Sequence, residues 1–262
     1  MNPIIDIGCN LTSSRLYPEI PRILAEARAA GVVQQIITGS DWQSNELGLQ
    51  LTEHYRELFT TAGFHPHHAS QWNPQYHPAL LQMICRDERV VAVGEMGLDY
   101  FRNLSSALQQ QRCFHDQLAV ASAVQKPVFL HMRAAFPDFQ RILSSYLPSI
   151  PKAVWHCFTG TRSELHWALD HGLYIGITGW ICDPKRGDNL RDIVAEIPDD
   201  RLMIESDAPY LTPKTLLPCP LNNEPKYLPE VLRVVAQCRQ QTMSHVAAIT
   251  TNNAHAFFNI KK

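Results

Sequence analysis

The sequence predicts an α/β protein, a (β/α)8 TIM barrel of the metal-dependent hydrolase type, formed as a single domain by residues 1–262. Eight apolar, β-rich runs alternate with stretches of helical periodicity, which is the order of elements in such a barrel. Several of these runs are continuous, as in QIIT, VVAV and PVFL, and continuous runs are typical of parallel strands buried on both faces. A chain of 262 residues is long enough for one barrel.

The elements can be assigned in order along the chain. The segments Ile20–Ala30 and Ala107–Val124 carry apolar residues at helical spacing, and Gly31 and Gly172 stand where helices should end. The Pro-rich stretch Pro209–Pro229 is expected to be a long functional loop after the eighth strand. A doubly wound open sheet is the alternative, although it usually has fewer strands. The expected strands are Ile4–Ile7, Gln35–Thr38, Leu58–Phe64, Val90–Gly94, Pro127–His131, Ala153–Phe158, Tyr174–Thr178 and Leu202–Ser206.

The composition excludes several classes of protein. The formal net charge of −2 excludes a surface that is basic throughout, so any nucleic-acid contact must depend on a local patch or a metal. Neither a long apolar run nor a basic region before an apolar stretch is present, so we expect no membrane span and no secretory signal. Seven scattered cysteines without a C-x-x-C pair indicate free thiols in the cytoplasm. We expect a monomer.

Polar residues follow the apolar runs where the expected strands end. Active sites of barrels gather at the carboxyl ends of the strands, and imidazole and carboxylate groups are ligands for zinc, manganese or magnesium. The sequence therefore predicts a divalent-metal site. The residues at these ends are Asp6, Asn10, His65, His67, Glu95, Asp99, His131, His156, Glu205 and Asp207.

Each of these residues also has a structural interpretation. A single His after a strand is more often a hydrogen-bonded structural residue than a ligand, and His65 or His67 could brace the turn at Pro66. Asp99 could cap a helix or pair with an Arg. Their joint occurrence at many strand ends favours a site. Because no phosphate-binding Gly-rich loop and no G-x-S-x-G motif occur, metal-activated water is favoured over nicotinamide or covalent Ser chemistry.

Nine motifs follow one another along nearly the whole chain. In this order they make the sequence similar to the TatD family of metal-dependent nucleases. The motifs are DIGCNLTSS at 6–14, TAGFHPH at 61–67, VGEMGLD at 93–99, HMR at 131–133, HCFTGTR at 156–162, YIGITGW at 174–180, ESDAPYL at 205–211, NEP at 223–225 and NNAHAFF at 252–258.

The resemblance implies a TIM barrel that hydrolyses nucleic-acid phosphodiesters with a divalent metal. By motif position it implies that Glu95, His131 and His156 are metal ligands. Asp207 would be the base or a further ligand, with His67 nearby in the catalytic group.

The sequence departs from the family pattern in two places. Many relatives carry an H-x-H after the first strand, where this chain has Gly8 and Asn10. Since neither residue supplies an imidazole, we expect one ion to be held firmly and a second one weakly. The other departure is Ala134, where relatives usually have Asp, which removes an orienting partner for Arg133.

The leading hypothesis is therefore a 3′→5′ exonuclease of single-stranded DNA or RNA, acting in nucleic-acid turnover or DNA repair. We expect Mg²⁺ as the ion, with Mn²⁺ or Zn²⁺ as alternatives. Arg133, Arg162 and Asn10 are expected to bind the substrate, and Phe101 is among the aromatic residues that could stack unpaired bases. The alternatives are a metal hydrolase of a small ester, amide or aminoacyl-RNA, and a binding module with a degenerate site.

Overall fold

The computed structural model describes residues 3–261. Its strands form one eight-stranded sheet in the sequential order β1 to β8. The pairs β1–β2, β3–β4, β4–β5, β5–β6 and β7–β8 are parallel. Sequential parallel strands with a helix after each strand are the topology of a (β/α)8 barrel. The strands are β1 (Ile4–Cys9), β2 (Val32–Ile37), β3 (Leu58–Ala62), β4 (Val90–Asp99), β5 (Val128–Arg133), β6 (Ala153–Trp155), β7 (Tyr174–Ile177) and β8 (Leu202–Ile204).

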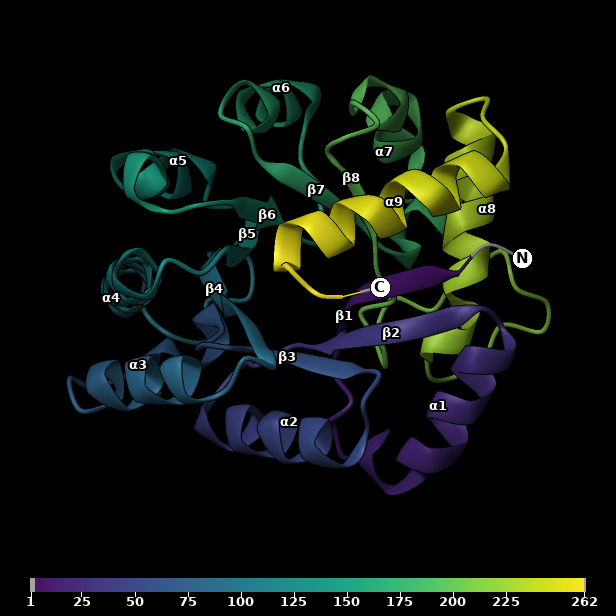
Figure 1. The fold of residues 1–262 in the computed structure, drawn as a ribbon. Helices are drawn as coiled ribbons and strands as arrows, with labels where there is room; N and C mark the ends of the chain where they lie inside the picture. The colour runs from purple at the N-terminus through teal and green to yellow at the C-terminus, as the bar shows by residue number, and fades with distance from the viewer. Residues whose placement is uncertain (1–2, 262) are drawn as a thin grey trace. The chain divides into compact units, whose positions relative to one another are not determined.

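The helices follow the strands along the chain, as Figure 1 shows. Short 3-10 turns also occur, among them η2 (Pro66–Gln71) directly after β3. The α-helices are α1 (Ile20–Ala29), α2 (Trp42–His54), α3 (Tyr76–Arg86), α4 (Ala107–Val124), α5 (Phe136–Tyr146), α6 (Arg162–Asp170), α7 (Asp188–Ile193), α8 (Leu228–Cys238) and α9 (Met243–Phe258).

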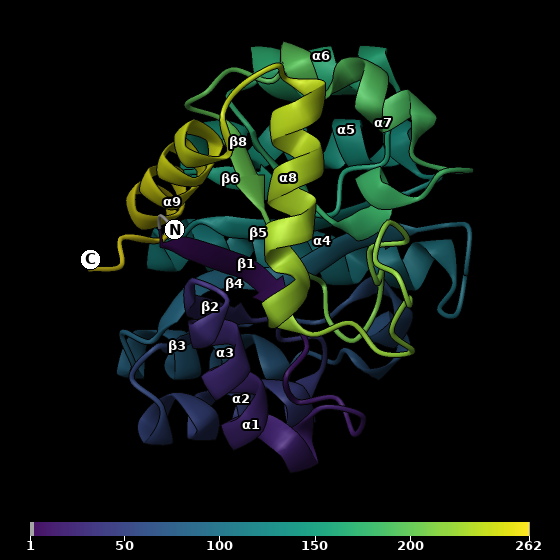
Figure 2. The same cartoon turned by 90° about the vertical axis from the view of Figure 1, so that its right-hand side faces the viewer.

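The chain divides into two compact units. Unit 1 comprises Met1–Ile37, Cys157–Asp170 and Tyr174–Lys262, and unit 2 comprises Thr38–His156 and His171–Leu173. Within unit 1, α8 and α9 pack on each other and against β8, and α9 also packs on β1 (Figure 2). Within unit 2, α4 packs against β4 and contacts α3 and α5 on its two sides (Figure 1). Whether residues 1–262 behave as one domain stays a prediction.

β4 is longer than the sequence suggested, and this changes the placement of the acidic residues. The strand continues from Val90 through Asp99, so Glu95 lies within it instead of after it. Gly97 makes the extension possible, since its φ of +144° is open to glycine and a Cβ there would collide with the His131 carbonyl oxygen. The close approach keeps β4 paired with β5 out to the Asp99–Arg133 pair.

β6 is shorter than predicted, because it ends at Trp155 instead of Phe158. The backbone of Cys157 adopts a φ of +45°, which is incompatible with an extended strand. His156 is therefore the last residue before the chain turns. The imidazole of His156 therefore lies at the carboxyl end of β6, as expected for a site residue.

Two buried glutamines on α4 attach this helix to the backbone of unit 2. Gln117 Oε1 accepts from the Phe64 amide at 2.7 Å, and its Nε2 donates to the Phe64 carbonyl at 3.0 Å. Gln110 forms the same two-bond clamp with Asp99, at 2.8 and 3.1 Å. The two glutamines are seven residues apart and therefore share one helix face. Helix α4 thus fixes the backbone just before His65 and at the end of β4.

The Pro-rich segment that follows β8 contains neither helix nor strand before the 3-10 turn at Pro225. Asn223 joins its ends, since its amide donates to the Pro209 carbonyl and its side chain to the Ser206 carbonyl. Between residues 3 and 261, no helix combines the length and apolar character needed to span a bilayer.

Candidate metal centre

One carboxylate oxygen of unit 2 collects three imidazole nitrogens. Glu95 Oε1 lies 2.7 Å from His156 Nε2, 3.0 Å from His131 Nδ1 and 3.2 Å from His65 Nε2. The four side chains come from β4, from the ends of β3 and β6, and from β5. Glu95, His156 and His65 are buried, and His131 is partly exposed. The structure therefore brings together the three residues of unit 2 predicted as metal ligands.

A second carboxylate supports this group from the end of β4. Asp99 Oδ2 accepts from His67 Nε2 at 2.7 Å and lies 3.5 Å from His131 Nε2. That longer separation is at the limit of a hydrogen bond, and Nε2 of His131 is buried without a hydrogen-bond partner of good geometry among the described residues. His131 thus lies between two carboxylates. A buried imidazole nitrogen without a good partner is an available donor atom for a cation.

The electrostatics keep the two carboxylates ionised. Burial alone would raise the pKa of Glu95, but the neighbouring His156 and His65 and the imidazole hydrogen bonds hold it well below its usual value. Asp99 is affected in the same way: burial opposes ionisation, and the adjacent imidazoles of His131 and His67 hold the pKa of Asp99 below its usual value. At neutral pH the site therefore presents two anions.

The imidazoles next to these anions differ from each other. Burial lowers the pKa of His65 to about 4, against the opposing effect of Glu95, so His65 is neutral at physiological pH. Burial also lowers the pKa of His131, but the adjacent carboxylates of Asp99 and Glu95 outweigh burial and raise the pKa of His131 above its usual value. A divalent cation would replace that proton as the compensating positive charge.

The donor set fits a divalent ion. Ligand atoms of His65, Glu95 and His131 lie within 4.8 Å of one another and could share an ion. This group contains two of the predicted ligands, Glu95 and His131, and has His65 in the place of His156. Mixed imidazole and carboxylate ligands suit zinc and manganese as well as harder ions. His65 differs from the other two, because its Nδ1 accepts the His67 backbone amide at 3.0 Å. In the neutral ring Nε2 then carries the proton. In this arrangement His65 donates to Glu95 and orients it.

The sequence alone did not identify the part played by His65. The sequence predicts both His65 and His67 at the end of the third strand, with His67 in the catalytic group. The structure places His65 against Glu95 and His67 against Asp99. The H-P-H pattern contained the signal, because a proline between two histidines turns the chain and lets both rings face one strand end. The glutamine clamps of α4 have no comparable sequence signal.

The remaining predicted site residues lie in unit 1, apart from Arg133. Asn10 Nδ2 donates to Asp207 Oδ1 at 3.1 Å and to the Ala208 carbonyl at 3.2 Å. The backbones of these segments also bond, since the Asp207 amide donates to Gly8 and the Asn10 amide to Ala208. Asn10 thus hydrogen-bonds the Asp207 carboxylate, and its role in substrate binding stays a prediction.

Two predicted substrate-binding arginines differ in their surroundings. Arg162 Nε is 2.8 Å from Glu196 Oε1, so its guanidinium is engaged in an ion pair on an exposed surface. Arg133, two residues after His131 on β5, lies with its guanidinium carbon 3.9 Å from the centre of the Phe101 ring. Their roles in substrate binding stay predictions.

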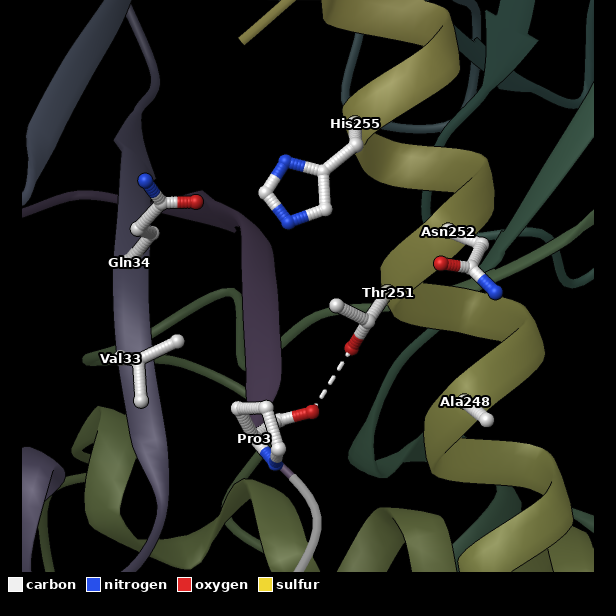
Figure 3. A pocket seen from close by; sticks show the side chains of 7 residues that line it. All are labelled: Pro3, Val33, Gln34, Ala248, Thr251, Asn252 and His255. Atoms are coloured by element: carbon white, nitrogen blue, oxygen red, sulfur yellow. Dashed lines mark hydrogen bonds between the residues drawn. The ribbon is translucent and has the colours of Figure 1, made fainter. Parts of the chain in front are cut away.

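Unit 1 also contains a cavity of about 510 Å³ (Figure 3). It is lined by Pro3 at the start of β1, by Val33 and Gln34 of β2, and by α9 residues that include Thr251 and His255. This is the amino-terminal end of β1, whereas Asn10 follows its carboxyl end. Because barrel enzymes carry out their chemistry at the carboxyl ends, we do not assign this cavity to catalysis.

Comparison with known proteins agrees with this geometry. The sequence profile of the family described as TatD related DNase matches residues 5–259. The chain belongs to the TatD family. It is 43% identical over 98% of its length, and 99% of the relative's, to the 3′-5′ ssDNA/RNA exonuclease TatD of Salmonella typhimurium. Identity to the protein of the same name from Edwardsiella piscicida is 45%, over 98% of this chain and all of the relative.

Solved TatD structures have the same fold. A TatD homologue from Escherichia coli K12 superposes with a TM-score of 0.91 at 28% identity, over 98% of each chain. A TatD family hydrolase from Entamoeba histolytica gives a TM-score of 0.88 at 23% identity, again over 98% of each chain. The family and the (β/α)8 fold class predicted from the sequence are therefore confirmed.

Proposed function

We propose that this TatD family member is a metal-dependent 3′→5′ exonuclease that hydrolyses phosphodiester bonds of single-stranded DNA and RNA. The observation that carries the proposal is the convergence of three imidazole nitrogens on one buried, ionised Glu95 oxygen. It occurs in a chain whose full-length relatives bear the name of such an exonuclease.

Glu95, His131 and His156 are the residues that we propose to hold the ion. Mg²⁺ remains our first expectation, and the imidazole donors suit Mn²⁺ and Zn²⁺ as well. When bound, the ion supplies a Lewis acid for the phosphate oxygen and lowers the pKa of a coordinated water. His65 donates to Glu95 and holds its carboxylate in one orientation, a supporting contact of the kind that fixes metal ligands.

The proton transfers are proposed for the chain's own carboxylate and imidazole groups. From its motif position, Asp207 accepts the proton of the attacking water, and Asn10 orients its carboxylate through Nδ2. His67, hydrogen-bonded to Asp99, holds a proton at Nε2 in the Asp–His arrangement common to acid–base sites. Arg133 and Arg162 bind phosphates of the strand.

The location that we propose is the cytoplasm. All seven cysteines are free thiols, and free thiols are typical of a reducing compartment. Turnover or repair of nucleic acid and a monomeric state remain predictions.

The proposed function is tested by a nuclease assay on 5′-labelled single strands, after chelator treatment and with metal added back. We expect progressive shortening from the 3′ end that requires an added divalent ion. A strand with a blocked 3′ end should resist cleavage. Metal-dependent hydrolysis of small esters without cleavage of single strands would instead indicate the alternative hydrolase.

A further inference from the structure

The end of β4 and the end of β5 together present an aromatic ring and a guanidinium next to the candidate metal centre. Phe101 follows Asp99 by two residues, and Arg133 follows His131 by two residues. The two strands are joined here, since Asp99 pairs with Arg133 and the Tyr100 amide donates to the Arg133 carbonyl at 3.0 Å. Two residues span at most about 7 Å, the distance in an extended strand such as His131–Arg133, and Phe101 lies in the turn that follows β4. The Cα atoms of Phe101 and Arg133 therefore lie within about 7 Å of those of Asp99 and His131, respectively.

The Phe101 ring is the most exposed aromatic side chain among the described residues. It is 64% exposed, although one of its faces lies 3.9 Å from the guanidinium carbon of Arg133. Exposed apolar side chains are common on protein surfaces, and what distinguishes this one is that it is aromatic, carries an arginine on one face and lies beside a polar centre. An unpaired nucleobase has a flat π-face that stacks on aromatic rings.

The loop that carries Phe101 is held at both ends. Asp99 Oδ1 accepts the Arg102 amide at 2.8 Å. Ser105 Oγ donates to the His67 carbonyl at 3.1 Å, and the Ser105 carbonyl accepts from Gln110. The ring is thus presented on an ordered loop, and ordering before binding reduces the entropy lost when a ligand is bound.

Arg133 retains its capacity to bind an anion. Within the described part of the chain the Arg133 guanidinium makes no hydrogen bond and no ion pair, and it packs on the Phe101 ring. Arg89 provides a comparison in the same unit: it lies 4.6 Å from the Phe59 ring, but it also donates to the carbonyls of Thr52, Tyr55 and Arg56. Arg89 is used structurally. The Arg133 fork of donors remains available for a phosphate.

We propose that Phe101 and Arg133 form a nucleotide subsite, in which the ring stacks the base and the guanidinium binds the phosphate of a nucleotide flanking the scissile bond. This inference rests on the proposed exonuclease function and deepens it, because it names the residues that recognise an unpaired strand. The subsite is indifferent to base identity, since every base offers a π-face.

The test compares intact single strands with strands that lack one base, at the terminal or at the penultimate 3′ nucleotide. For the unaltered protein with its metal, we expect loss of the stacked base at one of these positions to lower kcat/KM about 5- to 150-fold. For Phe101→Ala, kcat/KM on the intact strand should fall by a similar factor. Removal of the base should then cause no further decrease in kcat/KM. Phe101→Trp should restore the discrimination. Leu108→Ala, which removes another exposed apolar side chain (77% exposed), is the matched control and should discriminate as the unaltered protein does.

A binding measurement separates this proposal from the proposed function. Strands with 2-aminopurine at the same two positions are titrated with the protein under chelation, so that cleavage is not required. Quenching of 2-aminopurine fluorescence in the unaltered protein, and its loss in Phe101→Ala, would support the subsite even if no strand were cleaved. Arg133→Gln should reduce the slope of log affinity against log salt by about 0.7, the contribution of one phosphate contact. Cleavage or binding by Phe101→Ala with unchanged base dependence would overturn the subsite while leaving the exonuclease intact.

Discussion

Glu95 is the residue on which the candidate metal centre depends, because three imidazole nitrogens contact its single oxygen Oε1. Glu95→Gln keeps the shape of the side chain but removes the negative charge that holds a cation. We expect turnover of single strands to fall by at least about 100-fold, beyond the loss typical of residues that only support ligands. Glu46→Gln, at an exposed position of α2, is the matched control. Cleavage by Glu95→Gln at the parental rate would show that the site is misplaced.

Asp6 on β1 is a buried carboxylate that makes stability depend on pH. Burial is the largest cause and raises the pKa of Asp6 to about 7 from 3.8, and Oδ2 has no hydrogen-bond partner among the described residues. Because the folded pKa is the higher one, the fold favours the protonated acid. The contribution of protonated Asp6 to the free energy of unfolding is fully present below about pH 4 and is lost as the pH rises through about 7. The change is on the order of 4 kcal/mol.

Asp6→Asn should remove this dependence, since the neutral amide replaces the protonated acid. Relative to the parent, the variant should gain free energy of unfolding between pH 5 and pH 8, as measured by urea denaturation at each pH. Asp170→Asn, which changes an exposed Asp of the same unit, should track the parent. A constant difference between Asp6→Asn and the parent at both pH values would contradict the shift.

At the scale of the elements, helix α4 positions the centre through its two glutamine clamps. Gln117→Met removes both partners of the buried Phe64 amide and carbonyl, and buried unsatisfied backbone groups cost about 1–3 kcal/mol each. We expect the free energy of unfolding to fall by about 2–4 kcal/mol, with a loss of activity in the protein that remains folded, because His65 follows Phe64 directly. Denaturant titration and the strand assay measure the two effects.

The matched control for the helix is Gln75→Met, at an exposed position before α3 that makes no side-chain capping bond. It should leave stability within about 0.5 kcal/mol of the parent. If Gln117→Met were as harmless as this control, the clamp would contribute nothing to the position of the site.

The elements also show what periodicity can and cannot predict. Continuous β-branched runs predicted eight strands in the right order, because burial on both faces leaves a strong pattern. Their ends were less well predicted: β4 continues past Gly94 to Asp99, and β6 stops before His156. Both differences arise from backbone conformation, at Gly97 and at Cys157, which depends on neighbouring strands. A local pattern does not contain that information.

For the whole molecule, the sequence predicted the kinds of site residue better than their partners. Strand-end position selected Glu95, His131 and His156, which the structure brings together. The position at a strand end does not show that His65 contacts Glu95 while His67 contacts Asp99. Which ring faces which carboxylate depends on the conformation of the turn, in which the His67 amide donates to His65 Nδ1. The role of Asn10 as the partner of Asp207 likewise comes from residues 197 positions apart.

Metal binding should couple the candidate centre to the stability of the whole molecule. An ion that binds the folded state alone stabilises it by about 2.7 kcal/mol at a concentration 100 times its Kd. The midpoint temperature of thermal unfolding of the chelated protein should therefore rise when Mn²⁺ or Zn²⁺ is added, and Glu95→Gln should show no such rise.

Because Gly8 and Asn10 supply no imidazole and Asn10 is bonded to Asp207, calorimetric titration should find one firmly bound ion and a second one held weakly. Two equally tight ions, or an unchanged shift in Glu95→Gln, would show that ligands outside the Glu95 group hold the metal.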